Sequence, residues 1–338
     1  MNNLMKWCIL LMSLSLGIVA CETDKPTGEG GAGVDVDPPP IKNKVKAPKF
    51  DKDKAYGFVK TQVDFGSRVP GSVAHDSCAQ WLVAQLESFG AETIMQNGET
   101  ERHDGKRFPV KNIIGSFNPN AKKRVLLCAH WDSRYLADHD DDESRHNEPI
   151  LGADDGASGV GVLLEIARQI QQQPLEKIGV DIIFFDMEDQ GISGVPNMTN
   201  SDKTWCLGSQ YWARNKHKSG YDAEYGILLD MVGSKNARFP KEGFSVEHVG
   251  PQVNRIWKKA KEKGFGKWFV DQEVGPIIDD HVFVTTMGGI PTLDIINLPG
   301  GGRTFGHYWH THKDNMDVID KHTLKAVGQT VLTVLYEG

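Results

Sequence analysis

The sequence predicts an α/β protein built on a mostly parallel sheet with helices on both faces. Apolar runs of strand length alternate with segments of helical periodicity from about residue 50 onward. The strand-length runs are apolar throughout, which is typical of strands that are buried on both faces. With 338 residues, of which 39% are hydrophobic, the chain is long enough to bury a full core of this kind.

The predicted elements follow one another in a regular order. The first helix, within residues 72–91, has apolar side chains at helical spacing and stops at Gly90. Another helix, within 156–174, begins in small residues and is ended by Pro174. Strands are predicted within 123–133, 178–189, 225–233 and 290–300, and a closing helix within 323–338.

The N-terminus predicts export to a bacterial cell envelope, facing the periplasm or the exterior. Residues 1–20 contain Lys6 and a short apolar run, as in a signal peptide. The ending "IVAC" resembles a lipobox, so a lipidated Cys21 is expected to anchor the protein to the membrane; an ordinary signal peptide with an incidental Cys is the alternative. Residues 21–48 are rich in Gly, Pro and charge and predict a disordered tether, which leaves 49–338 as the catalytic domain.

Charge and cysteine content exclude two classes of protein. The formal net charge is −7, so nucleic acid is not an expected partner. With Cys21 lipidated, the remaining cysteines of the mature chain are odd in number and give no disulfide framework. They are Cys78, Cys128 and Cys206.

Side chains that bind metals cluster at one predicted edge of the sheet. Ligands of parallel α/β sheets bind beyond the carboxyl ends of the strands, and polar residues follow several of these ends. Together they suit zinc in a hydrolase or a transferase. Each alone is more often a solvated loop or a helix cap, and Asp154 and Asp155 could simply cap the helix that follows them. The candidates are His130, Asp132, Asp155, Glu188, Asp189, Asp230 and His310.

The stretch "FFDMEDQG" adds a physical reason for a metal. Asp186, Glu188 and Asp189 crowd the end of one buried strand, where like charges repel and desolvation is costly. A zinc ion opposite them would make this arrangement tolerable. One carboxylate would bind the ion, and its neighbour would stay free to move protons.

Several motifs together carry a resemblance to a known family. The motifs "HWDSR", "GADDGASG", "FFDMED", "LLDMVG", "DDH" and "WHTHKDN" occur in the order and approximate spacing of the zinc aminopeptidase-like superfamily. Within it, the chain most resembles bacterial glutaminyl cyclases, from Phe65 to the C-terminus. Asp279 in "IIDDHVF" and Trp309 before His310 match the cyclases, whereas Asp189 stands where many relatives have Glu. The resemblance implies a single-domain α/β/α sandwich with a central, mostly parallel mixed sheet.

The resemblance also implies roles for the metal-binding side chains. It makes Asp155, Asp189 and His310 the ligands of one zinc ion per chain and Glu188 the proton carrier. Cyclisation of an N-terminal glutamine requires its α-amine to attack its own side-chain amide and to expel ammonia. Zinc polarises the amide carbonyl, and a carboxylate beside it takes a proton from the amine and gives one to the leaving nitrogen.

Other residues are implied to complete the catalytic site and to contact substrate. Asp230 and Asp279 are expected to form a catalytic acidic network, and Asp279 also to bind substrate. Trp309 and Phe305 are expected to line an apolar pocket, although core packing would also explain both. His130 is a further candidate for substrate binding. Together with Asp230, it falls where dizinc aminopeptidases keep ligands for a second metal.

Three functions follow from this reading of the sequence. The favoured one is a monomeric glutaminyl-peptide cyclotransferase that converts N-terminal glutamine of peptides and proteins to pyroglutamate. A dizinc aminopeptidase is the alternative, because every potential position for a second metal holds a competent residue. The third is a catalytically silent binding lipoprotein, and the intact Glu188 beside an intact ligand set argues against it.

Overall fold

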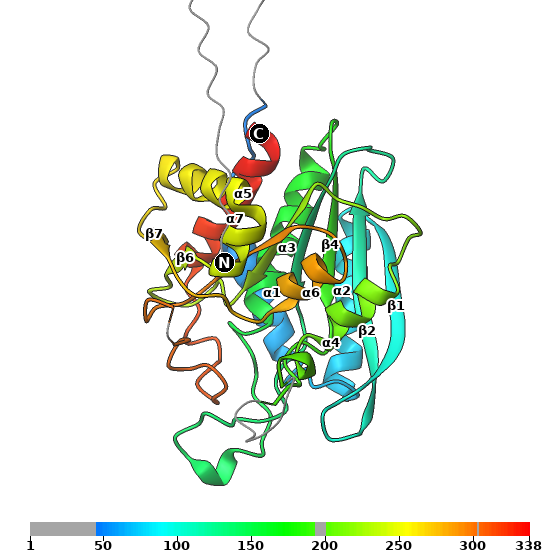
Figure 1. Cartoon of the computed structure of the whole chain (residues 1–338), viewed down its shortest axis with the longest axis vertical. Helices are drawn as coiled ribbons and strands as arrows, with labels where there is room; N and C mark the ends of the chain where they lie inside the picture. The colour runs from blue at the N-terminus through cyan, green and yellow to red at the C-terminus, as the bar shows by residue number, and fades with distance from the viewer. Residues whose placement is uncertain (1–44, 193–200, 303) are drawn as a thin grey trace, which may run out of the picture. The chain divides into compact units, whose positions relative to one another are not determined.

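Helices cover both faces of a central sheet in the computed structural model, which describes residues 45–192, 201–302 and 304–338 (Figure 1). The predicted signal peptide, the lipidated Cys21 and the tether up to residue 44 lie outside the described residues. The described part of the chain clusters in one compact unit. None of its helices is both long and apolar enough to cross a membrane.

The central sheet has six strands in the order β1-β2-β4-β3-β5-β8. Strands β4, β3, β5 and β8 run parallel, and the antiparallel pair β1–β2 joins them at one edge. This confirms the predicted mixed, mostly parallel sheet. A separate parallel pair is formed by β6 and β7. The strands are β1 Glu92–Glu101, β2 Arg107–Phe117, β3 Arg124–His130, β4 Gly179–Phe185, β5 Tyr225–Asp230, β6 Phe239–Lys241, β7 Phe269–Glu273 and β8 Thr292–Ile296.

The helices divide between the two faces of the sheet. Helices α1, α2, α3, α5 and α7 pack on one face, and α4 and α6 pack on the other. Figure 1 shows α3 lying along the sheet, with α1 and α7 beside it. The helices are α1 Lys52–Asp64, α2 Val73–Ser88, α3 Ala157–Gln172, α4 Leu207–Arg214, α5 Gly243–Glu262, α6 Asp280–Thr286 and α7 Lys321–Glu337, with short 3₁₀ turns at Glu143–Arg145 and Ser201–Thr204.

Alternating side chains of the buried strands fill two cores, one on each face. On β3, Leu127 belongs to the larger core under α1, α3 and α7, whereas Leu126 and Cys128 belong to the smaller core under α4 and α6. Because neighbouring residues of a strand point to opposite faces, a strand covered on both sides must be apolar throughout. The apolar runs that predicted these strands have this origin.

Helix starts coincide with capping residues that the sequence supplies. Ser72 accepts a hydrogen bond from the backbone N–H of His75 at the start of α2, and Asp320 accepts one from His322 at the start of α7. Helix α3 differs, because Gly156 precedes it and it has no side-chain cap. Asp154 and Asp155 therefore do not cap α3.

The edge hairpin was not indicated by the sequence. Strand β1 alternates between exposed and half-buried residues and has exposed glutamates at Glu92, Glu99 and Glu101. Charged side chains on an edge strand prevent pairing with another chain, but they also weaken the apolar signal from which strands are predicted. Helices α1 and α4–α6 and the β6–β7 pair were likewise not predicted.

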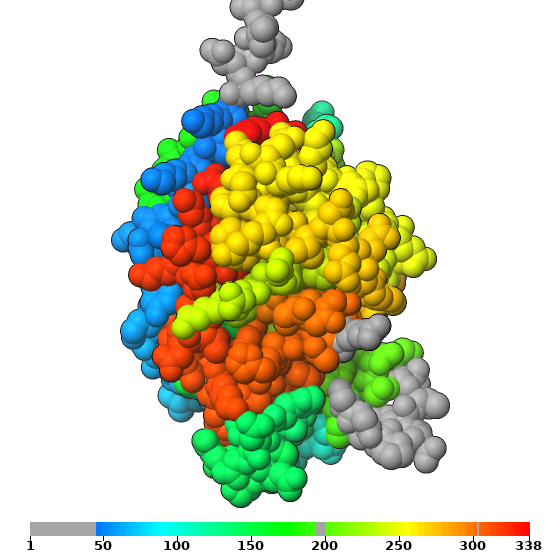
Figure 2. Space-filling view, turned by 90° about the vertical axis from the view of Figure 1, so that its left-hand side faces the viewer, coloured from blue at the N-terminus to red at the C-terminus, as the bar shows by residue number. Residues whose placement is uncertain are grey.

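The acidic loop 139–149 projects at the lower end of the molecule (Figure 2). Asp140 accepts hydrogen bonds from the backbone N–H and from Nδ1 of His312, both at 2.9 Å. The loop is therefore attached next to the segment that contains His310.

Candidate active site

The predicted site residues lie at the edge of the sheet where the parallel strands have their carboxyl ends. The last residue of β3, His130, is in register with Phe185, the last residue of β4, and β5 ends at Asp230. The loops beyond these ends enclose a pocket of about 300 Å³. Its lining residues are Asp155, Glu188, Asp189, Asp202, Trp205, Asp230, Met231, Ile277, Ile278, Asp279, Ile296, Phe305, Trp309 and His310.

The three predicted zinc ligands come together in this pocket. One donor atom from each of Asp155, Asp189 and His310 lies within 4.8 Å of the other two, and all three side chains are buried. Nε2 of His310 lies 3.1 Å from Oδ1 of Asp189 and 3.9 Å from Oδ2 of Asp155. The buried Oδ2 of Asp189 has no hydrogen-bond partner among the described residues. Two carboxylates and an imidazole facing one point fit a zinc site that keeps an open position.

A second cluster of metal-binding side chains shares Asp155 with the first. Nε2 of His130 lies 2.9 Å from Oδ1 of Asp155 and 3.2 Å from Oδ1 of Asp230. Burial lowers the pKa of His130, but the carboxylates of Asp132, Asp155 and Asp230 raise it well above its ordinary value. His130 does not line the pocket. This departs from the expectation that it binds substrate, because it lies one layer deeper, behind Asp155 and Asp230.

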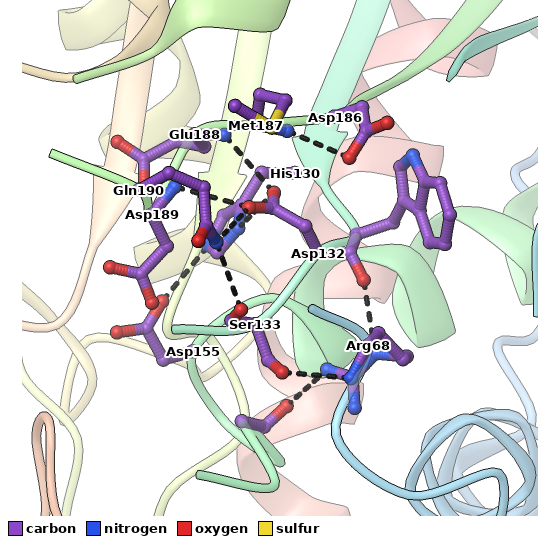
Figure 3. A network of polar contacts seen from close by, with 12 residues as sticks. Arg68, His130, Asp132, Ser133, Asp155, Asp186, Met187, Glu188, Asp189 and Gln190 are labelled. Carbon is purple, nitrogen blue, oxygen red and sulfur yellow. Dashed lines mark hydrogen bonds and ion pairs between the residues drawn. The ribbon is translucent and has the colours of Figure 1, made fainter. Parts of the chain in front are cut away.

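Asp132 holds the segment that follows β4 (Figure 3). Its Oδ1 accepts the backbone N–H of Glu188 at 3.1 Å, and its Oδ2 accepts that of Asp189 at 3.2 Å and Nε2 of Gln190 at 2.9 Å. Met187, with a φ of 57°, makes the turn that brings these N–H groups round to Asp132. Asp132 thus supports the site by contacting the backbone of the proposed ligand Asp189 and of the proposed proton carrier Glu188.

The crowding of carboxylates in "FFDMEDQG" is relieved because Asp186 points away from the pocket. Its oxygens lie 2.9 and 3.0 Å from Nε2 of His75, and Oδ2 accepts the backbone N–H of Lys111 at 2.8 Å. Of the three carboxylates in this stretch, only Glu188 and Asp189 therefore line the pocket. The sequence suggested a cation opposite all three, whereas a histidine from α2 accounts for Asp186.

The loop before α3 is shaped around Asp155. Asp314 accepts the backbone N–H groups of Asp154 and Asp155, at 2.8 and 3.1 Å. Gly156 has a φ of 99°, and a Cβ there would lie 2.4 Å from the carbonyl oxygen of Asp132, so only glycine fits. Asp154 points away and accepts the backbone N–H of Gly233 at 2.6 Å and the hydroxyl of Tyr308. Of the two adjacent aspartates, only Asp155 enters the pocket.

Three acidic side chains that line the pocket have raised pKa values. Burial raises the pKa of Asp230 to about 6, although the hydrogen bond from His130 lowers it. Burial, followed by the charge of Asp230, raises the pKa of Asp279 to about 7. Burial also raises the pKa of Glu188 well above its ordinary value, with His130 opposing and Asp279 adding to the effect. A carboxyl group with a pKa raised toward neutrality can both accept and donate a proton.

Aromatic rings form the remaining wall. Trp309 stacks on His310 with ring centres 3.6 Å apart, and Phe305 packs against Trp309 at 4.6 Å. Trp205 lies on a parallel plane 6.0 Å from His310. Phe305 and Trp309 line the pocket as expected, and both also pack against the small apolar cluster of Met231, Ile296 and Leu298.

Sequence reasoning missed several residues that support the site. Arg68 is fully buried and donates to the backbone carbonyls of Trp131, Leu151 and Gly152, at 3.0, 2.6 and 2.7 Å (Figure 3). It joins the loop after β3 to the loop before α3. Asp314 lies within the motif "WHTHKDN", and Arg68 lies near the start of the region that carries the resemblance, but the residue type alone did not indicate a support. Trp205 lies outside every motif and gave no signal.

Comparison with known proteins assigns the chain to a family. The model of peptidase family M28 matches residues 112–335, and the chain belongs to that family. A solved structure of a Zn-dependent exopeptidase from Parabacteroides distasonis is 51% identical, covers 86% of this chain and 100% of that chain, and has a TM-score of 0.83. A solved structure of Bacteroides thetaiotaomicron glutaminyl cyclase bound to N-acetylhistamine is 51% identical, covers 86% of this chain and 99% of that chain, and has a TM-score of 0.84.

A more distant curated relative is also a glutaminyl-peptide cyclotransferase. The curated glutaminyl-peptide cyclotransferase of Gloydius blomhoffii is 24% identical over 298 residues, which are 80% of this chain and 77% of that protein. The resemblance inferred from the motifs is therefore confirmed, and so is the fold class.

Proposed function

We propose that this protein is a zinc-dependent glutaminyl-peptide cyclotransferase that converts N-terminal glutamine to pyroglutamate with release of ammonia. The observation that carries the proposal is the placement of Glu188 in the same pocket as the buried triad Asp155, Asp189 and His310. A glutaminyl cyclase that is 51% identical and covers 86% of the chain supports the assignment, as do two further bacterial glutaminyl cyclases that are 49% identical.

The reaction needs one carboxylate that moves a proton between two nitrogens. Glu188 would take a proton from the neutral α-amine of the substrate as that nitrogen attacks the side-chain amide carbon. It would then deliver a proton to the amide nitrogen, which leaves as ammonia. Zinc held by Asp155, Asp189 and His310 would supply Lewis acidity at the amide carbonyl. We propose one zinc ion per chain.

The other pocket residues bind and orient the substrate. Asp230 and Asp279, with pKa values raised to about 6 and about 7, can accept and donate hydrogen bonds to the substrate nitrogens near neutral pH. Phe305 and Trp309 supply an apolar surface for the glutamine methylenes, and Ile277 adds to it. Together these walls would exclude water from the reacting amide.

A direct assay tests the proposal. Purified protein with measured zinc content is incubated with a peptide that begins with glutamine, and ammonia release and the mass of the product are followed. The matched control is the same peptide with an acetylated N-terminus, which lacks the attacking amine. Pyroglutamate formation that is absent from the acetylated peptide supports the proposal. Zinc-loaded protein that leaves the free peptide unchanged contradicts it.

A dizinc aminopeptidase is the second candidate because of one specific observation. Asp155 is shared between the triad with Asp189 and His310 and the cluster with His130 and Asp230, which is the arrangement needed to bridge two metals. Release of free amino acids from aminoacyl chromogenic substrates by protein with two zinc ions per chain would favour it.

We also propose that the protein is a lipoprotein of the bacterial cell envelope, anchored through Cys21. The apolar run and the "IVAC" sequence before the Gly- and Pro-rich segment support this. Labelling with a radioactive fatty acid in a bacterial host should mark the wild type and leave Cys21→Ser unlabelled. Label retained by Cys21→Ser would contradict the anchor.

We further propose that the domain acts as a monomer, because this chain by itself supplies the proposed ligand triad and Glu188 and needs no partner to complete them. Light scattering on the soluble domain should give the mass of one chain. A dimer mass at assay concentration would contradict this.

A further inference from the structure

Arg134 is a buried cation that contacts Asp138, which lies beside the proposed ligand His310, and the backbone of the proposed ligand Asp189. It lies in the segment between β3 and α3, and 1% of its side chain is exposed. Its Nε and Nη2 donate to Oδ1 and Oδ2 of Asp138, at 2.7 and 2.6 Å. Its Nη1 donates to the backbone carbonyls of Asp189 and Gly191, at 3.1 and 3.2 Å. The planar guanidinium is therefore bonded along two of its edges, which a lysine could not reproduce.

Asp138 connects this cation to His310. Oδ1 of Asp138 lies 3.3 Å from Nδ1 of His310, a contact in which the buried Nδ1 has no aligned hydrogen bond among the described residues. Nε2 of the same ring lies 3.1 Å from Oδ1 of Asp189 and faces the ligand triad. A carboxylate beside Nδ1 favours a proton on that nitrogen and leaves the lone pair of Nε2 free, as metal binding by histidine requires. The ring plane is held by Trp309, whose ring centre is 3.6 Å away.

The same guanidinium constrains Asp189. Besides its bond to the carbonyl, Nη1 lies 3.6 Å from Oδ1 of Asp189, and Oδ2 is left without a hydrogen-bond partner in the described part of the chain. The guanidinium carbon of Arg134 also lies 4.8 Å from the ring centre of Trp205, which lines the pocket. Arg134 thus joins the main chain of one ligand, the carboxylate that supports another, and the pocket wall.

We propose that Arg134 and Asp138 are positioning residues that act through His310 and Asp189 and set how tightly the site binds zinc. This inference rests on the ligand triad of the proposed function and is independent of which reaction the zinc site catalyses. A buried ion pair adds little net stability in general, so stability alone does not account for the pair. Residues that hydrogen-bond to metal ligands typically change metal affinity about 10–100-fold when replaced.

A second bidentate Arg–Asp pair, in which Asp181 is buried and Arg124 is partly buried, provides a matched control. Arg124 on β3 donates through Nε and Nη2 to Oδ2 and Oδ1 of Asp181 on β4, at 2.5 and 2.7 Å. The pair lies toward the opposite end of the same two strands, and neither residue lines the active-site pocket. The change in zinc affinity when this pair is broken measures the general effect of losing a bidentate Arg–Asp pair in this sheet.

The test measures zinc affinity by competition with a chelator in the purified protein. The variants are Asp138→Asn, Arg134→Lys, the control Asp181→Asn and the reference His310→Ala. We expect Asp138→Asn and Arg134→Lys to bind zinc about 10–100-fold more weakly than wild type, and Asp181→Asn to stay within about twofold. Cobalt-substituted Asp138→Asn should also show a shifted visible absorption spectrum, which a purely structural role would not produce. Thermal unfolding of the metal-free forms gives the stability of each variant.

Three results would overturn the inference. The first is zinc affinity within about twofold of wild type in both Asp138→Asn and Arg134→Lys while His310→Ala loses zinc. The second is an equal loss of affinity in Asp181→Asn. If Arg134→Lys fails to fold, Asp138→Asn decides the matter, because Asp138 is partly exposed and its replacement preserves shape. Tight zinc binding by His310→Ala would instead overturn the ligand triad itself, and the inference with it.

Discussion

The thiol of Cys206, a buried residue that does not line the pocket, donates a hydrogen bond to Oε1 of Glu188, the proposed proton carrier, across 3.1 Å. The backbone N–H of Cys206 also donates to the carbonyl of Glu188, at 2.9 Å. The side chain of Glu188 is therefore fixed independently of the neighbouring Asp189. A substitution at Glu188 can remove proton transfer without displacing the metal ligands.

We expect Glu188→Gln to lose activity by roughly 10²–10⁴-fold, the contribution of general acid–base catalysis, while zinc content stays at the wild-type value. The amide keeps the shape of the side chain but cannot accept the proton. Steady-state rates of ammonia release and elemental analysis of the same samples check this. Activity close to wild type would remove Glu188 from the mechanism.

Substitution of a proposed metal ligand should instead remove the zinc. His310→Ala or Asp155→Ala is expected to lose tightly bound zinc, because three protein ligands leave no spare. His312→Ala is the matched control, since it lies two residues away and pairs with Asp140. Stoichiometric zinc in His310→Ala after dialysis against a chelator would show that the ligand assignment is wrong.

The free energy of unfolding at acid pH should depend on the buried Glu242, which lies at the start of α5. Its oxygens accept the backbone N–H groups of Phe244 and Ser245, at 2.8 and 2.7 Å, and lie 3.2 Å from Nε2 of His281. Burial alone would raise the pKa of Glu242, but the hydrogen bonds from His281 and Ser245 lower it to about 2. The folded pKa lies below the ordinary value of 4.5, so the stabilisation is present above about pH 4.5 and is lost as pH falls toward 2.

The expected size of this contribution is about 3 kcal/mol at neutral pH, from about 1.4 kcal/mol for each unit of pKa shift. Glu242→Gln should therefore be less stable than wild type at pH 7, and the difference should shrink as the pH is lowered. Chemical unfolding of metal-free protein at several pH values measures it. Parallel stability curves for the two proteins would contradict the lowered pKa.

Residues Lys46 to Pro48 are hydrogen-bonded to the folded domain, so the domain begins before residue 49. The backbone N–H of Ala47 donates to Oε1 of Glu337 at 3.4 Å, and Gln329 donates to the carbonyl of Pro48 at 3.0 Å. A chain that starts at Val45 keeps these bonds, and we expect it to be soluble and fully active. Lower activity or a lower Tm than the chain that starts at Cys21 would show that the preceding segment contributes to the domain.

The parts of the fold that could be predicted are those with a strong local signal. Strands β3, β4, β5 and β8 are buried on both faces, so their sequences are mostly apolar, with Asp181 and Asp294 as interior exceptions. The site could be predicted because the carboxyl ends of parallel strands share an edge. Known strand ends then bring His130, Asp189 and Asp230 together.

The remaining features depend on contacts that are distant in sequence. Asp186 pairs with His75 across 111 residues, and Asp314 holds Asp155 from 159 residues away. No local pattern distinguishes such a supporting carboxylate from a ligand. The placement of His130 behind the pocket was missed for the same reason, since its position on β3 could not show which side chains would lie in front of it.

The last prediction separates the cyclotransferase from the aminopeptidase. Asp279 lines the pocket with a pKa raised to about 7, and its buried Oδ2 has no hydrogen-bond partner in the described segments. A carboxyl group in that state can hold the scissile amide nitrogen as ammonia leaves, so Asp279→Ala should abolish cyclisation and leave zinc content unchanged. A second metal would instead require Asp230 to be ionised and His130 to be neutral. The decisive measurement is metal stoichiometry by mass spectrometry in wild type, Asp279→Ala and His130→Ala. One zinc in all three, with cyclisation lost in Asp279→Ala, is the expected result. Two zinc ions in active wild type, falling to one in His130→Ala together with loss of aminoacyl-peptide hydrolysis, would establish the aminopeptidase instead.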